Sequence, residues 1–108
     1  MENKRHLMNG RVAGFSYWDG AEAFEHLKIG TELRLAREPE NKFDAYAVAL
    51  YFEEYKLGFV PRDMNHELSK YLDMGYEDIY DVRVNRLSSD AHPEEQVGFI
   101  IRIKNRIA

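Results

Sequence analysis

The residues with the greatest chemical potential lie between two apolar stretches, in the segment Arg37 to Asp44 (REPENKFD). This segment holds two basic residues, three acidic residues and one aromatic, Phe43, beside the turn formers Pro39 and Asn41. A plain connection between strands needs only turn formers, because Pro presets a turn dihedral while Asn and Asp bond to nearby backbone. The additional charged and aromatic side chains therefore indicate a binding surface.

Patterns for catalysis and metal binding are missing from the sequence. No pair of histidines has the spacing of three to five that a metal site on a helix uses, and there is no cysteine to supply a thiolate or a disulfide. No serine lies in a G-x-S-x-G elbow, and no Gly-rich string resembles a phosphate-binding loop. The paired acids Glu53-Glu54 and Glu94-Glu95 fall in predicted turns, where a solvated corner is the usual role. We therefore expect no enzyme activity, no cofactor and no metal. The four histidines are His6, His26, His66 and His92.

Length and composition bound the class of protein. The chain has 108 residues, of which 44% are hydrophobic, and this suits one domain with its own core. We expect residues 1–9 to be a flexible N-terminus and residues 10–108 to form that domain. The net charge of −4 disfavours a protein that coats duplex nucleic acid, because such binding scales with the phosphates neutralised. No apolar run is long enough to span a membrane, and we expect a cytoplasmic protein with no membrane partner.

Hydrophobic periodicity predicts six strands and two short helices. Helices are expected from Ala21 to Lys28, with Asp19 and Glu22 as a capping arrangement, and after Asp63, which is expected to cap the second one. The strands are expected at Gly10 to Tyr17, Leu33 to Ala36, Ala45 to Phe52, Tyr55 to Val60, Ile79 to Leu87 and Val97 to Lys104.

The strand from Ala45 to Phe52 is apolar on both faces, as in a central strand of a covered sheet or barrel. Its partners in the core are expected to be Phe99, Ile101 and Ile103, which alternate along the last strand. Without βαβ alternation, these elements predict an α+β or mainly β fold, a small six-stranded, partly open barrel of the OB type with two short helices. In such a barrel, Tyr17 and Trp18, the Arg37 to Asp44 loop and Arg62 are expected at one mouth.

Two strings at a fixed separation resemble the HIRAN domain. The first runs from Arg37 to Asp44 and continues to Ala47-Val48-Ala49, and the second is Lys56-Leu57-Gly58-Phe59-Val60-Pro61-Arg62. The segment Val12 to Tyr17 resembles the opening strand of that family, so the resemblance covers nearly the whole chain. It implies a barrel related to the OB-fold with two helices, in agreement with the elements above.

The resemblance also implies a ligand, the 3′ end of single-stranded DNA. It makes Tyr17 and Phe43 base stackers, Asp44 the acceptor for the terminal hydroxyl and Arg62 a phosphate ligand. Trp18 and Arg37 join the candidate site through their expected place at the mouth. Structural roles compete with these functions: Asp44 could bond backbone amides, Arg37 could pair with Glu38 or Glu40, and Phe43 could cap the barrel.

This sequence departs from DNA-end-binding members at several positions. Ser16 stands in place of a basic residue, Phe43 lacks a tyrosine hydroxyl, Lys42 replaces a common proline and Tyr46 replaces an asparagine. Two hypotheses follow: a module that binds single-stranded DNA ends in repair or replication-fork processing, or an interaction module that has lost DNA binding. A helicase or a nuclease is a candidate protein partner. The sequence leaves open DNA versus RNA and the oligomeric state.

Overall fold

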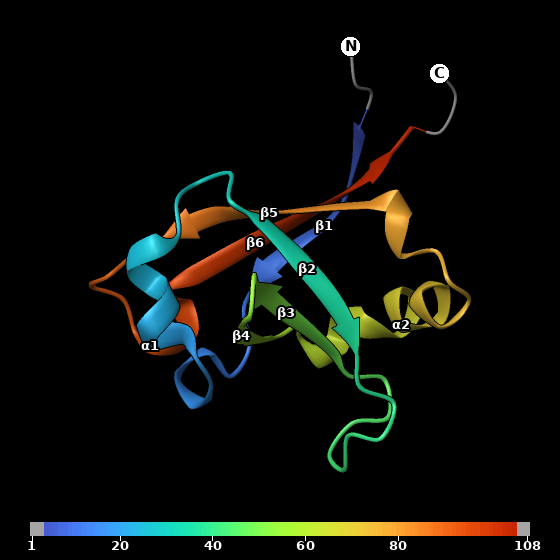
Figure 1. The fold of residues 1–108 in the computed structure, drawn as a ribbon, viewed down its shortest axis with the longest axis horizontal. Helices are drawn as coiled ribbons and strands as arrows, with labels where there is room; N and C mark the ends of the chain where they lie inside the picture. Colours follow the sequence, from blue (N-terminus) through green and yellow to red (C-terminus); the bar gives the residue numbers. More distant parts are fainter. Residues whose placement is uncertain (1–3, 106–108) are drawn as a thin grey trace.

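The computed structural model describes residues 4–105, which form one antiparallel sheet of six strands in the order β1-β6-β5-β2-β3-β4 (Figure 1). Consecutive strands β2, β3 and β4 are neighbours, as the sequence predicts, while β1 pairs with β6 at the opposite end of the sheet. The strands are β1 (Lys4–Arg11), β2 (Glu32–Arg37), β3 (Val48–Phe52), β4 (Tyr55–Phe59), β5 (Tyr80–Leu87) and β6 (Val97–Lys104).

The sheet curls into a partly open barrel, which confirms the predicted fold class. Ala13, just beyond β1, meets Phe59 of β4 through two backbone hydrogen bonds of 2.8 Å, one in each direction. This bridge brings the two ends of the sheet together. Gly58 makes the close approach possible, because a side chain there would overlap the carbonyl oxygen of Ala13 and lie 2.8 Å from a methyl group of Val12.

The predicted start of the first strand is wrong. β1 begins at Lys4 rather than near Gly10, so residues 4–9 belong to the sheet, and residues 1–3 lie outside the described part of the chain. The end is wrong as well, because Gly14 has a positive φ of 71° and Phe15–Tyr17 form a 3-10 turn. An edge strand has one neighbour and is largely exposed, so polar residues are tolerated and the apolar pattern used for prediction is weak.

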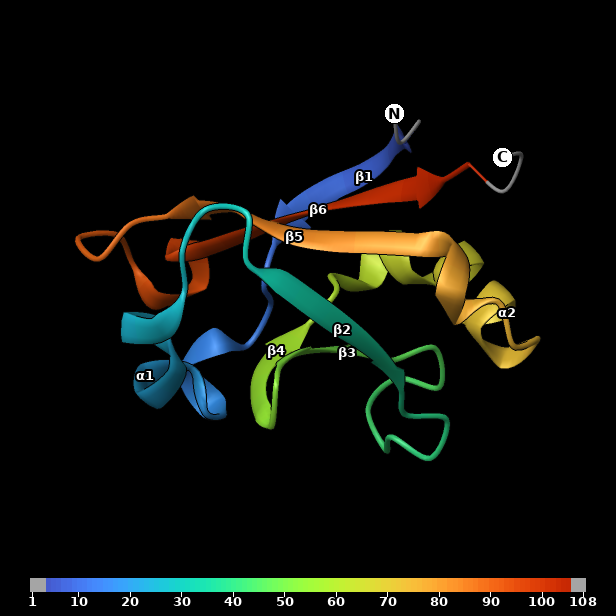
Figure 2. The same ribbon diagram turned by 45° about the horizontal axis from the view of Figure 1, so that its top comes forward.

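Two short helices flank the sheet, α1 (Gly20–Ala23) and α2 (Asn65–Asp73), as Figure 2 shows. The first is shorter than predicted and continues as a 3-10 turn, Phe24–His26. Neither predicted cap is made, since no side chain caps the start of α1 or α2. Asp19 instead accepts a hydrogen bond from the Lys56 amide at 3.1 Å and so ties α1 to β4.

The core contains the two strands predicted to supply it. Val48 and Leu50 of β3 and Phe99 and Ile101 of β6 are fully buried in one hydrophobic cluster. Ile103, also predicted to point inward, is 37% exposed near the end of β6. Across residues 4–105, no helix has the length and apolar character needed to cross a membrane.

Candidate nucleic-acid interface

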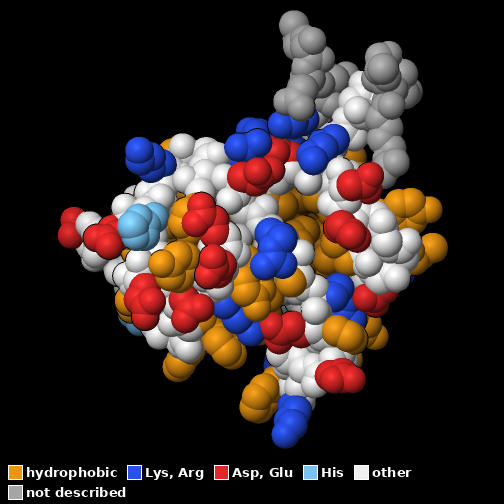
Figure 3. Space-filling model, viewed as in Figure 1, with side chains coloured by type: hydrophobic (Ala, Val, Ile, Leu, Met, Phe, Trp, Pro, Cys, Tyr) orange, Lys and Arg blue, Asp and Glu red, His pale blue; other side chains and the backbone are white. Residues whose placement is uncertain are grey.

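A pocket of about 340 Å³ lies where the β2–β3 loop faces the end of β4 and the turn after β1. Four of the six predicted site residues line it: Trp18, Phe43, Asp44 and Arg62. In the space-filling view, hydrophobic and basic side chains meet at the tip of the β2–β3 loop, at the bottom of the molecule (Figure 3). The other lining residues are Ala13, Gly14, Asn41, Lys42, Ala47, Phe59 and Val60.

Asn41 holds the loop in the shape that presents Phe43. Its side-chain oxygen accepts hydrogen bonds from the amides of Phe43 at 2.9 Å and Asp44 at 3.1 Å, and its side-chain nitrogen donates to Glu38 at 3.1 Å. This is the local side-chain-to-backbone bonding that makes Asn a turn residue. Phe43 is left 84% exposed, so it does not cap the barrel. An exposed ring on a braced loop is available for stacking.

Asp44 has internal partners and still faces the pocket. Its Oδ1 accepts from the Tyr46 amide at 2.9 Å, and its Oδ2 accepts from Asn65 Nδ2 at 2.8 Å. Burial alone would raise the pKa of Asp44, but these two bonds and the charge of Arg62 outweigh it and lower the pKa below its ordinary value. The carboxylate is therefore ionised at neutral pH. Because an ionised carboxylate has about four acceptor positions, it can accept a further bond from a ligand.

Asn65 supports this carboxylate from inside the fold. The residue is 1% exposed, and its Oδ1 has no hydrogen-bond partner within residues 4–105. Its amide orientation is fixed by Asp44, since only the nitrogen can donate to a carboxylate.

Arg62 joins the loop to the start of α2. Its guanidinium donates to the backbone oxygen of Phe43 at 2.6 Å and lies 3.8 Å from Asp44 Oδ2. The side chain is 70% exposed, so much of its donor capacity faces solvent at the pocket. A guanidinium in that position can hold a phosphate.

Trp18 forms an aromatic wall that a lysine supports from one side. The Lys56 ammonium lies 3.7 Å from the centre of the Trp18 ring and 4.5 Å from that of Phe59. The two rings meet edge to face at 5.8 Å. Lys56 is also paired with Glu38 at 2.6 Å, so its charge is largely used inside the protein. Trp18 remains 46% exposed toward the pocket.

Two predicted site residues do not line the pocket. Tyr17 is 78% exposed on the 3-10 turn that precedes Trp18. Arg37 pairs with Asp73 of α2 at 2.8 Å, rather than with Glu38 or Glu40, and donates to the backbone oxygens of the loop. Arg37 is thus a brace between loop and helix.

The structure adds Phe59, Asn41 and Lys56 to the site. All three lie within the two strings that resemble the HIRAN domain, so their positions were visible in the sequence, although their roles were not. No signal in the sequence places Lys56 on Trp18, because the contact joins the segment just before α1 to β4, and these segments lie far apart in the chain. No three His, Asp or Glu side chains come together as a metal site anywhere in residues 4–105.

The HIRAN domain family model matches residues 6–105, nearly the whole chain, and the chain belongs to this family. Members of the family are generally modules that bind single-stranded DNA.

A similar fold occurs in a crystal structure of a protein from Lactobacillus plantarum, determined by a structural genomics consortium. The two superpose with a TM-score of 0.80 at 20% sequence identity, over 98% of this chain and 100% of the other. At that identity the likeness bears on the fold alone. A search of curated proteins gives no significant match.

Proposed function

We propose that this protein is a binding module, without catalytic activity, for the 3′ end of single-stranded DNA. The observation that carries the proposal is the convergence of Trp18, Phe43, Asp44 and Arg62 on one pocket in a member of the HIRAN family. Each side chain has the chemistry that one part of a strand end requires.

The aromatic residues would hold the terminal bases. A base stacked on an aromatic ring gains about 1 to 3 kcal/mol without a sequence requirement. Phe43 is the exposed ring of the loop, and Trp18 is braced by Lys56. Arg62 would hold a phosphate, and Asp44 would accept a hydrogen bond from the terminal hydroxyl. Together they select an end rather than the interior of a strand.

The test compares labelled single strands that end in a 3′ hydroxyl or a 3′ phosphate, measured by fluorescence anisotropy. A 3′ phosphate would face the ionised Asp44, so it should bind at least about tenfold more weakly, because a hydrogen bond to a charged acceptor contributes roughly 1.5 to 3 kcal/mol. Trp18→Ala and Phe43→Ala should weaken both strands alike. Arg62→Ala should reduce the salt dependence by about one phosphate.

Asp44→Asn is the sharpest variant for the preference between the two ends. Rotation of the Asn65 amide would turn its unpartnered oxygen toward residue 44, where it can accept from the new amide, so the fold should be kept. The preference for the hydroxyl end should fall toward unity. Asp90→Asn, the same charge change in the exposed loop before β6, is the control and should leave the preference unchanged.

If the unsubstituted protein binds the 3′-hydroxyl and 3′-phosphate strands with equal affinity, Asp44 is not the acceptor for the terminal hydroxyl. No measurable affinity for either strand would favour the second candidate, an interaction module. The net charge of −4 and the pairing of Lys56 with Glu38 support that alternative, because both reduce the free positive charge at the pocket. The main proposal also includes a role in repair or replication-fork processing, a helicase or nuclease as partner, and a cytoplasmic location.

A further inference from the structure

Strand β2 changes its pairing partner along its length, from β5 at residues 32–33 to β3 at residues 34–37. Its register with β3 runs from Arg34↔Tyr51 to Arg37↔Val48, whereas its register with β5 ends at Leu33↔Val82. Beyond that point the two strands diverge, and Figure 1 shows β2 crossing away from β5 toward α2. The sheet is therefore split, with one edge of β2 unpaired from residue 34 to residue 37.

The backbone groups that face this split can be assigned from both ends of β2. Before the strand, the Thr31 carbonyl accepts from an amide of β5 at 2.9 Å, and after it the Glu38 amide donates to the β3 side at 3.0 Å. Alternate residues of a strand direct their backbone groups to opposite neighbours. Residues 31, 33, 35 and 37 therefore face the β5 side, and residues 34, 36 and 38 face β3. Leu35 and Arg37, which lie beyond the last pair with β5, direct their N–H and C=O groups into the split.

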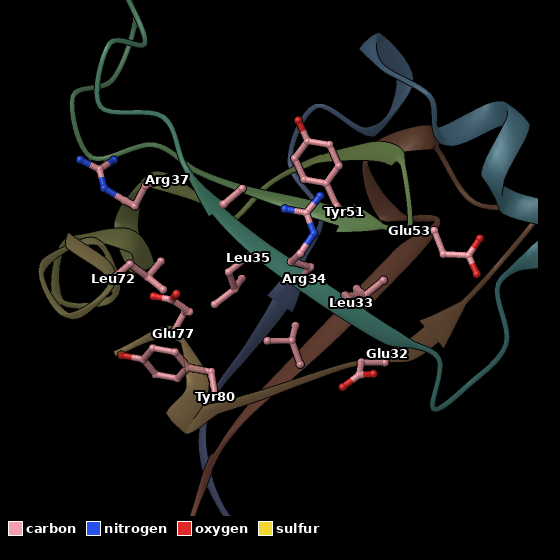
Figure 4. A pocket seen from close by; sticks show the side chains of 12 residues that line it. Glu32, Leu33, Arg34, Leu35, Arg37, Tyr51, Glu53, Leu72, Glu77 and Tyr80 are labelled. Atoms are coloured by element: carbon pink, nitrogen blue, oxygen red, sulfur yellow. The ribbon is translucent and has the colours of Figure 1, made fainter. Parts of the chain in front are cut away.

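A groove of about 740 Å³ follows this edge. Figure 4 shows Leu35, Leu72, Glu77 and Tyr80 on one side of β2, while Arg34 and Tyr51 lie on the other side. The floor is apolar, because it is made by Leu35 and Leu72 with the deeper residues of β2 and β5. The groove shares no lining residue with the pocket of Trp18 and Phe43. It is thus a second, separate site.

The charges around the groove favour a basic ligand. Three exposed carboxylates line it, those of Glu32, Glu53 and Glu77. Of the two arginines, Arg37 is 13% exposed and paired with a carboxylate, whereas Arg34 keeps its charge and lies over Tyr51 at 4.5 Å on the side of β2 away from Leu72 and Glu77. Such a rim repels phosphates and attracts lysine or arginine side chains.

We propose that this groove docks an extended, basic segment of a partner protein, which adds to the free edge of β2 as an extra strand. An unpaired strand edge needs N–H and C=O partners at strand spacing, which an extended polypeptide supplies. Apolar side chains of the segment would pack on Leu35 and Leu72, and a lysine or arginine would meet Glu77. The surface serves a partner other than the DNA end, and the proposal stands whether or not the first pocket binds DNA.

The test uses a probe peptide, Lys-Val-Lys-Val-Lys with blocked ends, added to the isotope-labelled protein and followed by NMR. The amides of Leu35 and Arg37 should shift, and their hydrogen exchange should slow at least about tenfold at saturation, the protection expected of a strand edge that has become paired. The amides of Arg34 and Ala36 face β3 and should keep their exchange rates.

Matched reagents separate strand addition from charge attraction. The same peptide methylated at every backbone nitrogen should bind at least about tenfold more weakly, because it cannot donate to the edge. Glu77→Lys should weaken the unmodified peptide at least about threefold, while Glu22→Lys, the same change on α1 outside the groove, should not. A spectrum with unchanged dispersion shows that each variant is folded.

Several results would overturn the proposal. Equal binding of the methylated peptide or of Glu-Val-Glu-Val-Glu would contradict strand addition or the charge argument. Shifts of the Leu35 and Arg37 amides with a single-stranded oligonucleotide would assign the groove to nucleic acid. Shifts that grow with protein concentration in the absence of peptide would assign it to a second copy of the chain.

Discussion

Gly58→Ala should open the barrel at its closing bridge. At this position φ is 150°, in a region that L side chains rarely adopt, and an added Cβ would overlap the Ala13 carbonyl oxygen, a backbone atom with no side-chain freedom to move aside. Holding a residue in such a sparsely populated backbone region costs about 1 to 3 kcal/mol. Separation of residue 13 from Phe59 removes two backbone hydrogen bonds, a further loss of about 1 to 3 kcal/mol.

Gly75→Ala is the matched control. Gly75 also has a positive φ, 88°, but an added Cβ there meets nothing within 4 Å. The control should therefore lose the backbone contribution and keep the bridge. For a domain of this size, 1 kcal/mol corresponds to about 4 °C in Tm, so Gly58→Ala should melt roughly 4 to 12 °C below Gly75→Ala.

Thermal unfolding followed by circular dichroism measures this difference directly. If the two variants melt within about 2 °C of each other, the bridge at Ala13 does not contribute to stability and the reasoning is refuted. Hydrogen exchange at the Ala13 and Phe59 amides gives an independent readout, since both should lose protection in Gly58→Ala alone.

Three further predictions concern the core, acid stability and metal. Val48→Asp should abolish cooperative unfolding, because a buried unpaired carboxylate costs several kcal/mol against a total of roughly 5 to 15, and an unchanged Tm would contradict the core assignment. Burial opposes ionisation of Asp81, but the hydrogen bond and charge of Arg83, with Lys4, lower its pKa below the ordinary 3.8. Its contribution to stability is therefore complete above about pH 4 and is lost as pH falls through the lowered folded-state pKa, so Asp81→Asn should flatten the urea-measured stability profile in that acid range. A chelator should leave the Tm unchanged, whereas zinc retained after dialysis would contradict the expected absence of a metal.

The sequence by itself determined the elements whose signals are local. Alternation and dense apolar runs located β2 to β6 to within a few residues, since burial of one or both faces imposes that pattern on any strand in a core. The loop from Arg37 to Asp44 was identifiable as a candidate binding surface because its residue types exceed what a turn requires. The two strings of the HIRAN family lie in the same stretch, so family and fold could be inferred together.

Only the tertiary structure decided how the loop side chains are used. Arg37 and Arg62 are both basic residues next to the same loop, yet one pairs with Asp73 of α2 and the other stays exposed at the pocket. Asp44 makes the structural bond that the sequence allowed, to a backbone amide, and it also lines the pocket. These outcomes depend on contacts between residues far apart in the chain, which local pattern does not encode.

Two features that the sequence did not reveal, the early start of β1 and the split beside β2, both depend on which strands pair. An edge strand such as β1 gains its order from its neighbour β6, so its polar sequence gives little warning. Strand β2 leaves β5 after Leu33 and runs toward α2, where it pairs with β3 alone. Strand pairing depends on contacts between residues far apart in the chain. The free edge of β2 is therefore visible only in the folded structure.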